Sequence, residues 1–197
     1  IAPQQIRYIF LTHAHDDHAG YLNEVLSECP DLQIVMSDKA LERLYRGQNS
    51  FHGGCTTKIA LFFCYLMKFV GKGKHLFPSI KQEYQCRCIQ VTEQNRKQVE
   101  LLLQGKIIDT PGHTADSISL LLNDGSLFCG DAAMNGLPSL HRITIWAEDK
   151  TAFLKSWETI IALRPNLIYP GHGKPFKDED LKINLKRAKN MELLPIQ

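Results

Sequence analysis

A cluster of histidines and aspartates lies within the first twenty residues, directly after the apolar run at residues 8–11. The cluster reads His-Ala-His-Asp-Asp-His. Histidine is the commonest metal ligand in proteins, and carboxylates occupy the harder sites beside it. In an extended segment His13 and His15 point to the same side, so one ion can contact both. Asp17 and His18 follow where a helix would start and can reach a second ion. Buried imidazoles and carboxylates need partners, so the cluster predicts a metal site at a strand end.

The composition is typical of a folded domain and narrows the classes of partner. The chain has 197 residues, of which 44% are hydrophobic and 22% charged, and its net charge is +2. This length suits a single domain over residues 1–197. The balanced charge does not favour a nucleic-acid or anionic-membrane partner. The longest apolar stretch, residues 59–66, is too short to cross a membrane.

The six cysteines are scattered rather than set at the spacings of a disulfide scaffold. This favours a reducing compartment, in which most thiols act as small hydrophobes, and we expect a cytoplasmic protein. Cys86 and Cys88 form a C-x-C pair, which differs from the C-x-x-C of zinc ribbons and redox motifs. Residue 1 is isoleucine rather than methionine, so we expect the natural N-terminus, and any targeting signal that it carries, to lie outside this sequence.

Hydrophobic periodicity predicts strands and helices that alternate at the start of the chain, which is typical of an α/β protein. Strands are expected at residues 8–12 and 33–36, a helix at 17–28, and a second helix with Ser37 as its N-cap. From about residue 47 to 104 the pattern loosens. A helix is expected at 57–70, whereas 84–103 fits a strand or a helix. We interpret this middle stretch as a variable insertion, where specificity loops often occur.

The second half of the chain is more regular. Asp124-Gly125 between two apolar runs predicts a β-hairpin. Asp149 is expected to open a helix that turns Phe153 and Trp157 to the core. The expected strands are 106–109, 117–122, 127–130 and 166–169, and the expected helices are 149–163 and 178–192.

Three further ligand-type residues follow these later strands. His113 lies in the turn Pro-Gly-His-Thr, Asp131 follows Gly130, and His172 lies in the turn Pro-Gly-His-Gly. Glycine lets the backbone turn sharply or come close, as a crowded metal site requires. Each residue taken alone is more often structural than a ligand. Together with the first cluster they predict one shared metal site.

These motifs resemble the metallo-β-lactamase fold superfamily. Its H-x-H-x-D-H pattern is matched by residues 13–18, and its later motifs by the turns that contain His113, Asp131 and His172. The match runs from about residue 8 to 176, outside the middle stretch. The resemblance implies an α/β fold, an αββα sandwich of two mixed sheets flanked by helices. Members usually carry several strands before the first motif, so we expect this sheet to lack its N-terminal strands.

The resemblance also implies how seven ligands divide between two divalent metal ions. Zinc suits the mixed imidazole and carboxylate set, and iron or manganese are alternatives. Asp17 would additionally hydrogen-bond the attacking water, which makes it the candidate catalytic residue. One ion would be held by His13, His15 and His113, the other by Asp17, His18 and His172, and Asp131 would bridge them.

The ligand set resembles the glyoxalase II, lactonase and ribonuclease Z branches, because aspartate rather than cysteine is at the bridging position. We therefore expect a dinuclear metal-dependent hydrolase that uses a metal-bridging hydroxide on a small ester, thioester or lactone. Two alternatives stay open. One is a phosphodiesterase or ribonuclease of the same fold, and the other is a mononuclear iron persulfide dioxygenase.

The remaining polar residues carry weaker signals. His141 and Arg142 could border the pocket, although a surface role is favoured, and His52 and His75 in the insertion are equally compatible with surface positions. The basic C-terminal helix lacks an aromatic platform for RNA. The expected partner is thus a small molecule rather than nucleic acid or a membrane. An exposed sheet edge would favour a homo-oligomer.

Overall fold

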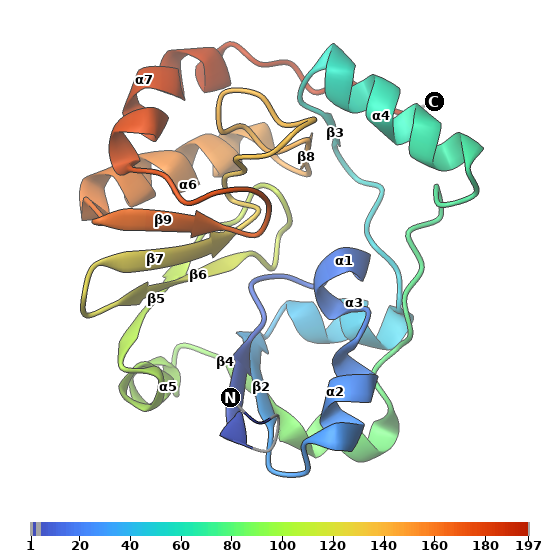
Figure 1. The fold of residues 1–197 in the computed structure, drawn as a ribbon, viewed down its shortest axis with the longest axis vertical. Helices are drawn as coiled ribbons and strands as arrows, with labels where there is room; N and C mark the ends of the chain where they lie inside the picture. Colours follow the sequence, from blue (N-terminus) through green and yellow to red (C-terminus); the bar gives the residue numbers. More distant parts are fainter. Residues whose placement is uncertain (1, 3–4, 197) are drawn as a thin grey trace.

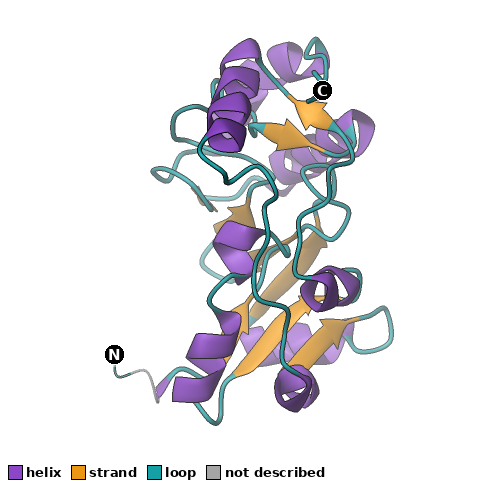
Figure 2. Ribbon diagram, turned by 90° about the vertical axis from the view of Figure 1, so that its right-hand side faces the viewer, coloured by secondary structure: helices purple, strands orange, loops and turns teal. Residues whose placement is uncertain are grey.

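Two β-sheets pack face to face between two layers of helices, as the sequence predicted (Figure 1). The computed structural model describes residues 2 and 5–196. Figure 2 shows that a small third sheet lies at one end of the molecule, away from the sheet that contains the first strand of the chain. This third sheet pairs β3 (Gly54–Cys55) with β8 (Trp146–Ala147) in antiparallel fashion.

The first sheet has the order β1-β2-β4, and its three strands are parallel. Side chains of β2 alternate between its two faces. Ile34 and Met36 pack under the outer helices, whereas Val35 faces the second sheet. The strands are β1 (Tyr8–Phe10), β2 (Gln33–Ser37) and β4 (Cys88–Val91), and the helices that follow β1 and β2 are α1 (Asp16–Ala19), α2 (Leu22–Glu28) and α3 (Ala40–Arg46).

The second sheet has the order β5-β6-β7-β9 and is mixed, because β9 runs parallel to β7 while the other pairs are antiparallel. Helices α6 (Lys150–Leu163) and α7 (Asp178–Lys189) cover its outer face. Asp149 caps α6 as predicted, since its carboxylate accepts a hydrogen bond from the Ala152 amide at 3.0 Å. The strands are β5 (Gly105–Asp109), β6 (Ile118–Leu122), β7 (Ser126–Gly130) and β9 (Leu167–Pro170).

The stretch expected to be an insertion contains elements of two kinds. Helix α4 (Lys58–Phe69) and the 3-10 helix η2 (Gln82–Arg87) lie at the periphery, where most of their residues are at least partly exposed. In contrast, β4 joins the first sheet, and α5 (Arg96–Leu103) places Val99 in the core between the sheets. The ambiguous segment 84–103 thus forms both a strand and a helix.

Two local predictions were wrong. The helix expected at 17–28 is interrupted at Gly20, and Tyr21 leaves the helical region with φ −104° and ψ 6°. Glycine disfavours a continuous helix at this point. Ser37 does not cap α3 but ends β2, because the strand continues one residue further than its apolar run.

Candidate metal centre

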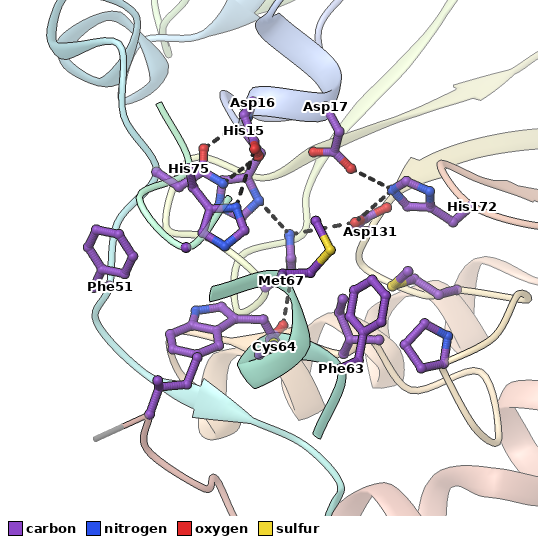
Figure 3. A pocket seen from close by; sticks show the side chains of 18 of the residues that line it. His15, Asp16, Asp17, Phe51, Phe63, Cys64, Met67, His75, Asp131 and His172 are labelled. Carbon is purple, nitrogen blue, oxygen red and sulfur yellow. Dashed lines mark hydrogen bonds and ion pairs between the residues drawn. The ribbon is translucent and has the colours of Figure 1, made fainter. Parts of the chain in front are cut away.

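The seven predicted ligand residues converge at one end of the two sheets. Figure 3 shows His15, Asp17, Asp131 and His172 among them. His13 and His15 lie in the loop after β1, and Asp17 and His18 lie in α1. The other three follow strand ends of the second sheet: His113 follows β5, Asp131 follows β7 and His172 follows β9. Loops from both sheets therefore contribute to one site.

The seven side chains form two adjacent groups, and within each group the ligand atoms lie within 4.8 Å of one another. All members of the first are buried, whereas the second reaches the surface through Asp17. We call them the histidine group (His13, His15 and His113) and the aspartate–histidine group (Asp17, His18, Asp131 and His172).

The histidine group turns free ring nitrogens towards a common point. His113 Nε2 lies 3.1 Å from His15 Nδ1. The other nitrogen of His113, Nδ1, lies 2.8 Å from the carbonyl oxygen of Trp146 and donates its hydrogen there. His13 Nδ1 lies 3.1 Å from Thr12 Oγ1. Such outer contacts leave the Nε2 lone pairs of His13 and His113 available to a cation.

Asp131 is the member of the aspartate–histidine group that also approaches the histidine group. Its Oδ2 is 3.7 Å from His113 Nε2 and 3.5 Å from His172 Nε2, while its Oδ1 is 3.7 Å from His18 Nε2. On the outer side, Asp17 Oδ2 is 2.9 Å from His172 Nε2. The carboxylate of Asp131 is thus placed where it contacts members of both groups, as the bridging role requires.

Burial and neighbouring charge lower the pKa values of two histidines in the first group and raise those of the two histidines in the second. Burial, reinforced by the surrounding imidazoles, holds the pKa of His13 and His15 well below the usual value. Burial alone would lower the pKa of His18, but the nearby carboxylate of Asp131 raises it instead. The hydrogen bond to Asp17 raises the pKa of His172. Neutral imidazoles, the form that binds metals, are therefore favoured at His13 and His15.

The residues present fit a pair of cations. Buried side-chain atoms without a hydrogen-bond partner among the described residues include His13 Nε2, His15 Nε2, His18 Nε2 and Asp131 Oδ1. Four such atoms in one cluster are costly unless a bound group satisfies them. Gly171 leaves room for this crowding, because a Cβ there would lie 2.6 Å from Asp131 Oδ1 and 2.7 Å from His18 Cε1.

A buried ion-pair network supports the loops of the histidine group, and no local sequence pattern indicated it. Arg43 contacts both oxygens of Glu148 at 2.7 and 2.8 Å, and its Nε lies 3.1 Å from Asp116. Asp116 in turn accepts a hydrogen bond from the Ala14 amide at 2.8 Å, and Glu148 accepts one from the Ala115 amide at 2.8 Å. The network thereby joins the loop after β1 to the loop after β5.

A cavity of about 520 Å³ opens beside the ligands (Figure 3). His15, Asp17, Asp131 and His172 contribute to its wall at the metal end. The rest of the wall is mainly apolar and comes from α4, from the chain next to β3 and β8, and from the loop after β7. It includes Phe51, Phe63, Met67, Leu137, Ile145 and Trp146.

Polar side chains that are not candidate ligands also line this cavity. Asp16 is not a ligand but accepts a hydrogen bond from Asn49 at 2.7 Å and contacts His75 Nδ1 at 3.2 Å. The hydrogen bond to Asp16 raises the pKa of His75. His75 reaches the cavity from the segment after α4, 57 residues along the chain from His18, so neither spacing nor periodicity indicated it.

The other histidines and Arg142 lie outside the cavity wall. Arg142 donates hydrogen bonds to Asp180 at 2.8 and 3.0 Å, and His141 contacts Arg187 at 2.8 Å. His52 is exposed. The favoured surface interpretation of His141, Arg142 and His52 agrees with these contacts, whereas His75 departs from it.

The sequence and the fold are both similar to known proteins. A family model described as the metallo-beta-lactamase superfamily matches residues 1–172. A Beta-lactamase-like protein 2 homolog of Drosophila melanogaster is 32% identical over 93 residues, which is 45% of this chain and 30% of that protein. A protein of the same name from Caenorhabditis elegans is 26% identical over 196 residues, 94% of this chain and 50% of that protein.

More distant relatives extend the similarity. A hydroxyacylglutathione hydrolase of Nitrosococcus oceani is 25% identical over 193 residues, 95% of this chain and 56% of that protein. The chain thus spans 30%, 50% and 56% of the length of these three relatives. An archaeal metallo-beta-lactamase superfamily protein from Sulfolobus tokodaii shares the fold with a TM-score of 0.58 and 20% identity, over 96% of this chain and 70% of that one.

No helix in the described part of the chain is long and apolar enough to span a membrane.

Proposed function

The chain belongs to the metallo-beta-lactamase superfamily, and from this premise we propose that it is a dinuclear metal hydrolase acting on a small ester, thioester or lactone. The family consists generally of metal-dependent hydrolases, and one relative is named as a hydroxyacylglutathione hydrolase. The observation that carries the proposal is the convergence of seven ligand side chains, with four unpartnered buried atoms, at one end of a cavity.

We propose that the histidine group holds one divalent cation, that Asp17, His18 and His172 hold another, and that Asp131 contacts both. Zinc suits this donor set best, and iron or manganese remain alternatives. Bound together, two such ions would supply Lewis acidity and lower the pKa of a water molecule towards neutrality.

The chain's own residues would orient the reactants. Asp17 lies in the cavity wall and is half-exposed, so its carboxylate would accept a hydrogen bond from the attacking water. Phe63, Met67 and Trp146 would pack against the apolar part of a substrate and exclude water from it. His75, held by Asp16, would donate a hydrogen bond from Nε2 to a polar substituent of the substrate. A small substrate with an apolar body fits these walls.

Replacing Asp131 tests the shared ligand. Because even an outer-shell partner of a metal ligand contributes about 10–100-fold, we expect Asp131→Ala to reduce hydrolysis by more than about 100-fold. The measurement is the rate on a panel of esters, thioesters, lactones and phosphodiesters, with metal content determined by plasma mass spectrometry. Asp109→Ala is the matched control, since Asp109 also ends a strand of the second sheet but pairs with Arg96 at the surface.

Three results would contradict the proposal. Undiminished hydrolysis in Asp131→Ala would show that Asp131 is not a ligand shared by the two ions. Cleavage of phosphodiesters alone would indicate a nuclease or phosphodiesterase. A content of one iron per chain, with no hydrolysis of the panel, would indicate the mononuclear oxygenase.

A further inference from the structure

Two cysteines that the metal chemistry does not use lie in contact, one in the cavity wall and the other behind it. Cys55 ends β3 and is fully buried, and Cys64 lies in α4 and lines the cavity (Figure 3). Their Sγ atoms are 3.4 Å apart, and both thiols are free. A disulfide bond is about 2.05 Å long, so the two sulfur atoms need to approach by only about 1.4 Å to form one.

The surroundings give the two thiols different roles. Cys64 is the one that a small molecule in the cavity meets, because Cys55 has no exposed surface. The hydrogen bond from Cys55 lowers the pKa of Cys64, and the nearby charge of His75 acts in the same direction. The same hydrogen bond, together with burial, raises the pKa of Cys55. Low thiolate pKa and access are the features of an oxidisable cysteine, and an adjacent second thiol can resolve its oxidised form.

We propose that Cys55 and Cys64 form a reversible thiol–disulfide site that reacts with peroxides entering the cavity. The Cys64 thiolate attacks one oxygen of hydrogen peroxide, the O–O bond breaks, and Cys64 becomes a sulfenic acid while hydroxide leaves. The Cys55 thiol then displaces the sulfenic oxygen as water, and the S–S bond forms. In total, two thiols are oxidised, one peroxide is reduced, and two water molecules are released.

The bond would alter the cavity. It would tie α4 to β3, and α4 supplies Phe63 and Met67 to the apolar wall. It would also remove the Cys64 thiol from that wall. The inference stands on the Cys55–Cys64 contact and does not depend on the proposed hydrolase activity.

Peptide mapping of the full zinc-loaded chain tests the site directly. The protein is reduced, freed of reductant, treated with hydrogen peroxide, blocked with iodoacetamide and digested with trypsin without reductant. Trypsin cleaves after Lys58, so Cys55 and Cys64 fall on separate peptides, residues 47–58 and 59–68. We expect these two peptides to be recovered joined, with a mass lower by two hydrogen atoms, and to separate after reduction.

Variants give matched controls. Cys64→Ser should abolish the joined peptides, and Cys55→Ser should leave a Cys64 sulfenic acid that dimedone traps. Cys86→Ser, which removes an exposed thiol, should leave the link unchanged. Two results would overturn the proposal: recovery of both peptides alkylated after peroxide treatment, or oxidation of Cys64 to a sulfinic acid without a link to Cys55.

Discussion

The histidine group and the aspartate–histidine group use similar side chains in opposite surroundings. The histidine group is buried, and the Arg43 network and the backbone of surrounding loops set its geometry. The aspartate–histidine group extends to the surface, and its members contact mainly one another. Buried contacts with the rest of the fold therefore hold the first group in place, whereas contacts among its own members hold the second. Substitutions around the first should therefore cost stability, and those around the second should cost metal binding.

The largest effect is expected from Arg43→Ala. Arg43 is the cation between Asp116 and Glu148, whose side chains are 0% and 6% exposed. Removing it leaves two buried carboxylates without a counter-charge, which typically costs about 3–5 kcal/mol. Urea unfolding of the metal-free protein should show this loss.

Arg142→Ala is the control near His172, because Arg142 donates a hydrogen bond to Asn135 and the Asn135 amide donates one to the His172 carbonyl. Arg142 pairs with Asp180, and both side chains are about one-third exposed. Its loss should cost no more than about 1 kcal/mol. Equal losses in Arg43→Ala and Arg142→Ala would break the distinction between the two groups.

Two glycines that precede ligand histidines give a second, smaller contrast. Gly112, before His113, has φ +131°, and a Cβ there would lie 2.3 Å from backbone atoms of Phe153. Backbone strain of this kind costs about 1–3 kcal/mol, so Gly112→Ala should lower the free energy of unfolding by at least that amount. In Gly171→Ala the new Cβ would instead meet the side chains of Asp131 and His18.

Gly171→Ala should therefore keep the fold and lose about half of the bound zinc. Urea unfolding and zinc content, measured on both variants, separate the two effects. A Gly171→Ala protein that keeps two ions, or that unfolds as readily as Gly112→Ala, would contradict the proposed division of the site.

The sequence placed the seven candidate ligands together because each belongs to a short motif that follows a strand, where the hydrophobic pattern changes. Apolar runs and turn signals, which are local, predicted most of the strands and helices, whereas the αββα layers followed from the resemblance of the motifs to the superfamily. The Arg43 network escaped prediction because its members are 32 to 105 residues apart and carry no periodicity. His75 escaped for the same reason: only the path of the chain after α4 brings it to Asp16. Long-range polar contacts are set by the fold and leave no mark in a short window of sequence.

The smallest expected effect concerns the contact between His75 and Asp16, which lies beside the aspartate–histidine group. Both side chains are about one-third exposed, so the pair should contribute less than about 1 kcal/mol. His75 has φ +44°, and asparagine tolerates this region, so His75→Asn removes the charge with little backbone strain. The charge of the Cys64 thiolate also acts on His75. Both proteins should therefore carry Cys64→Ser, so that the titration of this thiol does not contribute to the difference between them.

The pH dependence of this contact has a definite sign. Asp16 stays ionised throughout, because its hydrogen bonds with His75 and Asn49 outweigh burial and keep its pKa below 3.8. The pKa of His75 is raised above 6.5 in the folded protein. The contribution of protonated His75 to the free energy of unfolding is therefore complete below the pKa of histidine in the unfolded chain. It is lost as the pH rises through the pKa of His75 in the folded protein. The difference in unfolding free energy between the parent and His75→Asn, followed by urea titration without metal, should fall from pH 6 to pH 9. A difference that is constant over this range would show that His75 carries no stabilising charge, and that Asp16 is held by Asn49 alone.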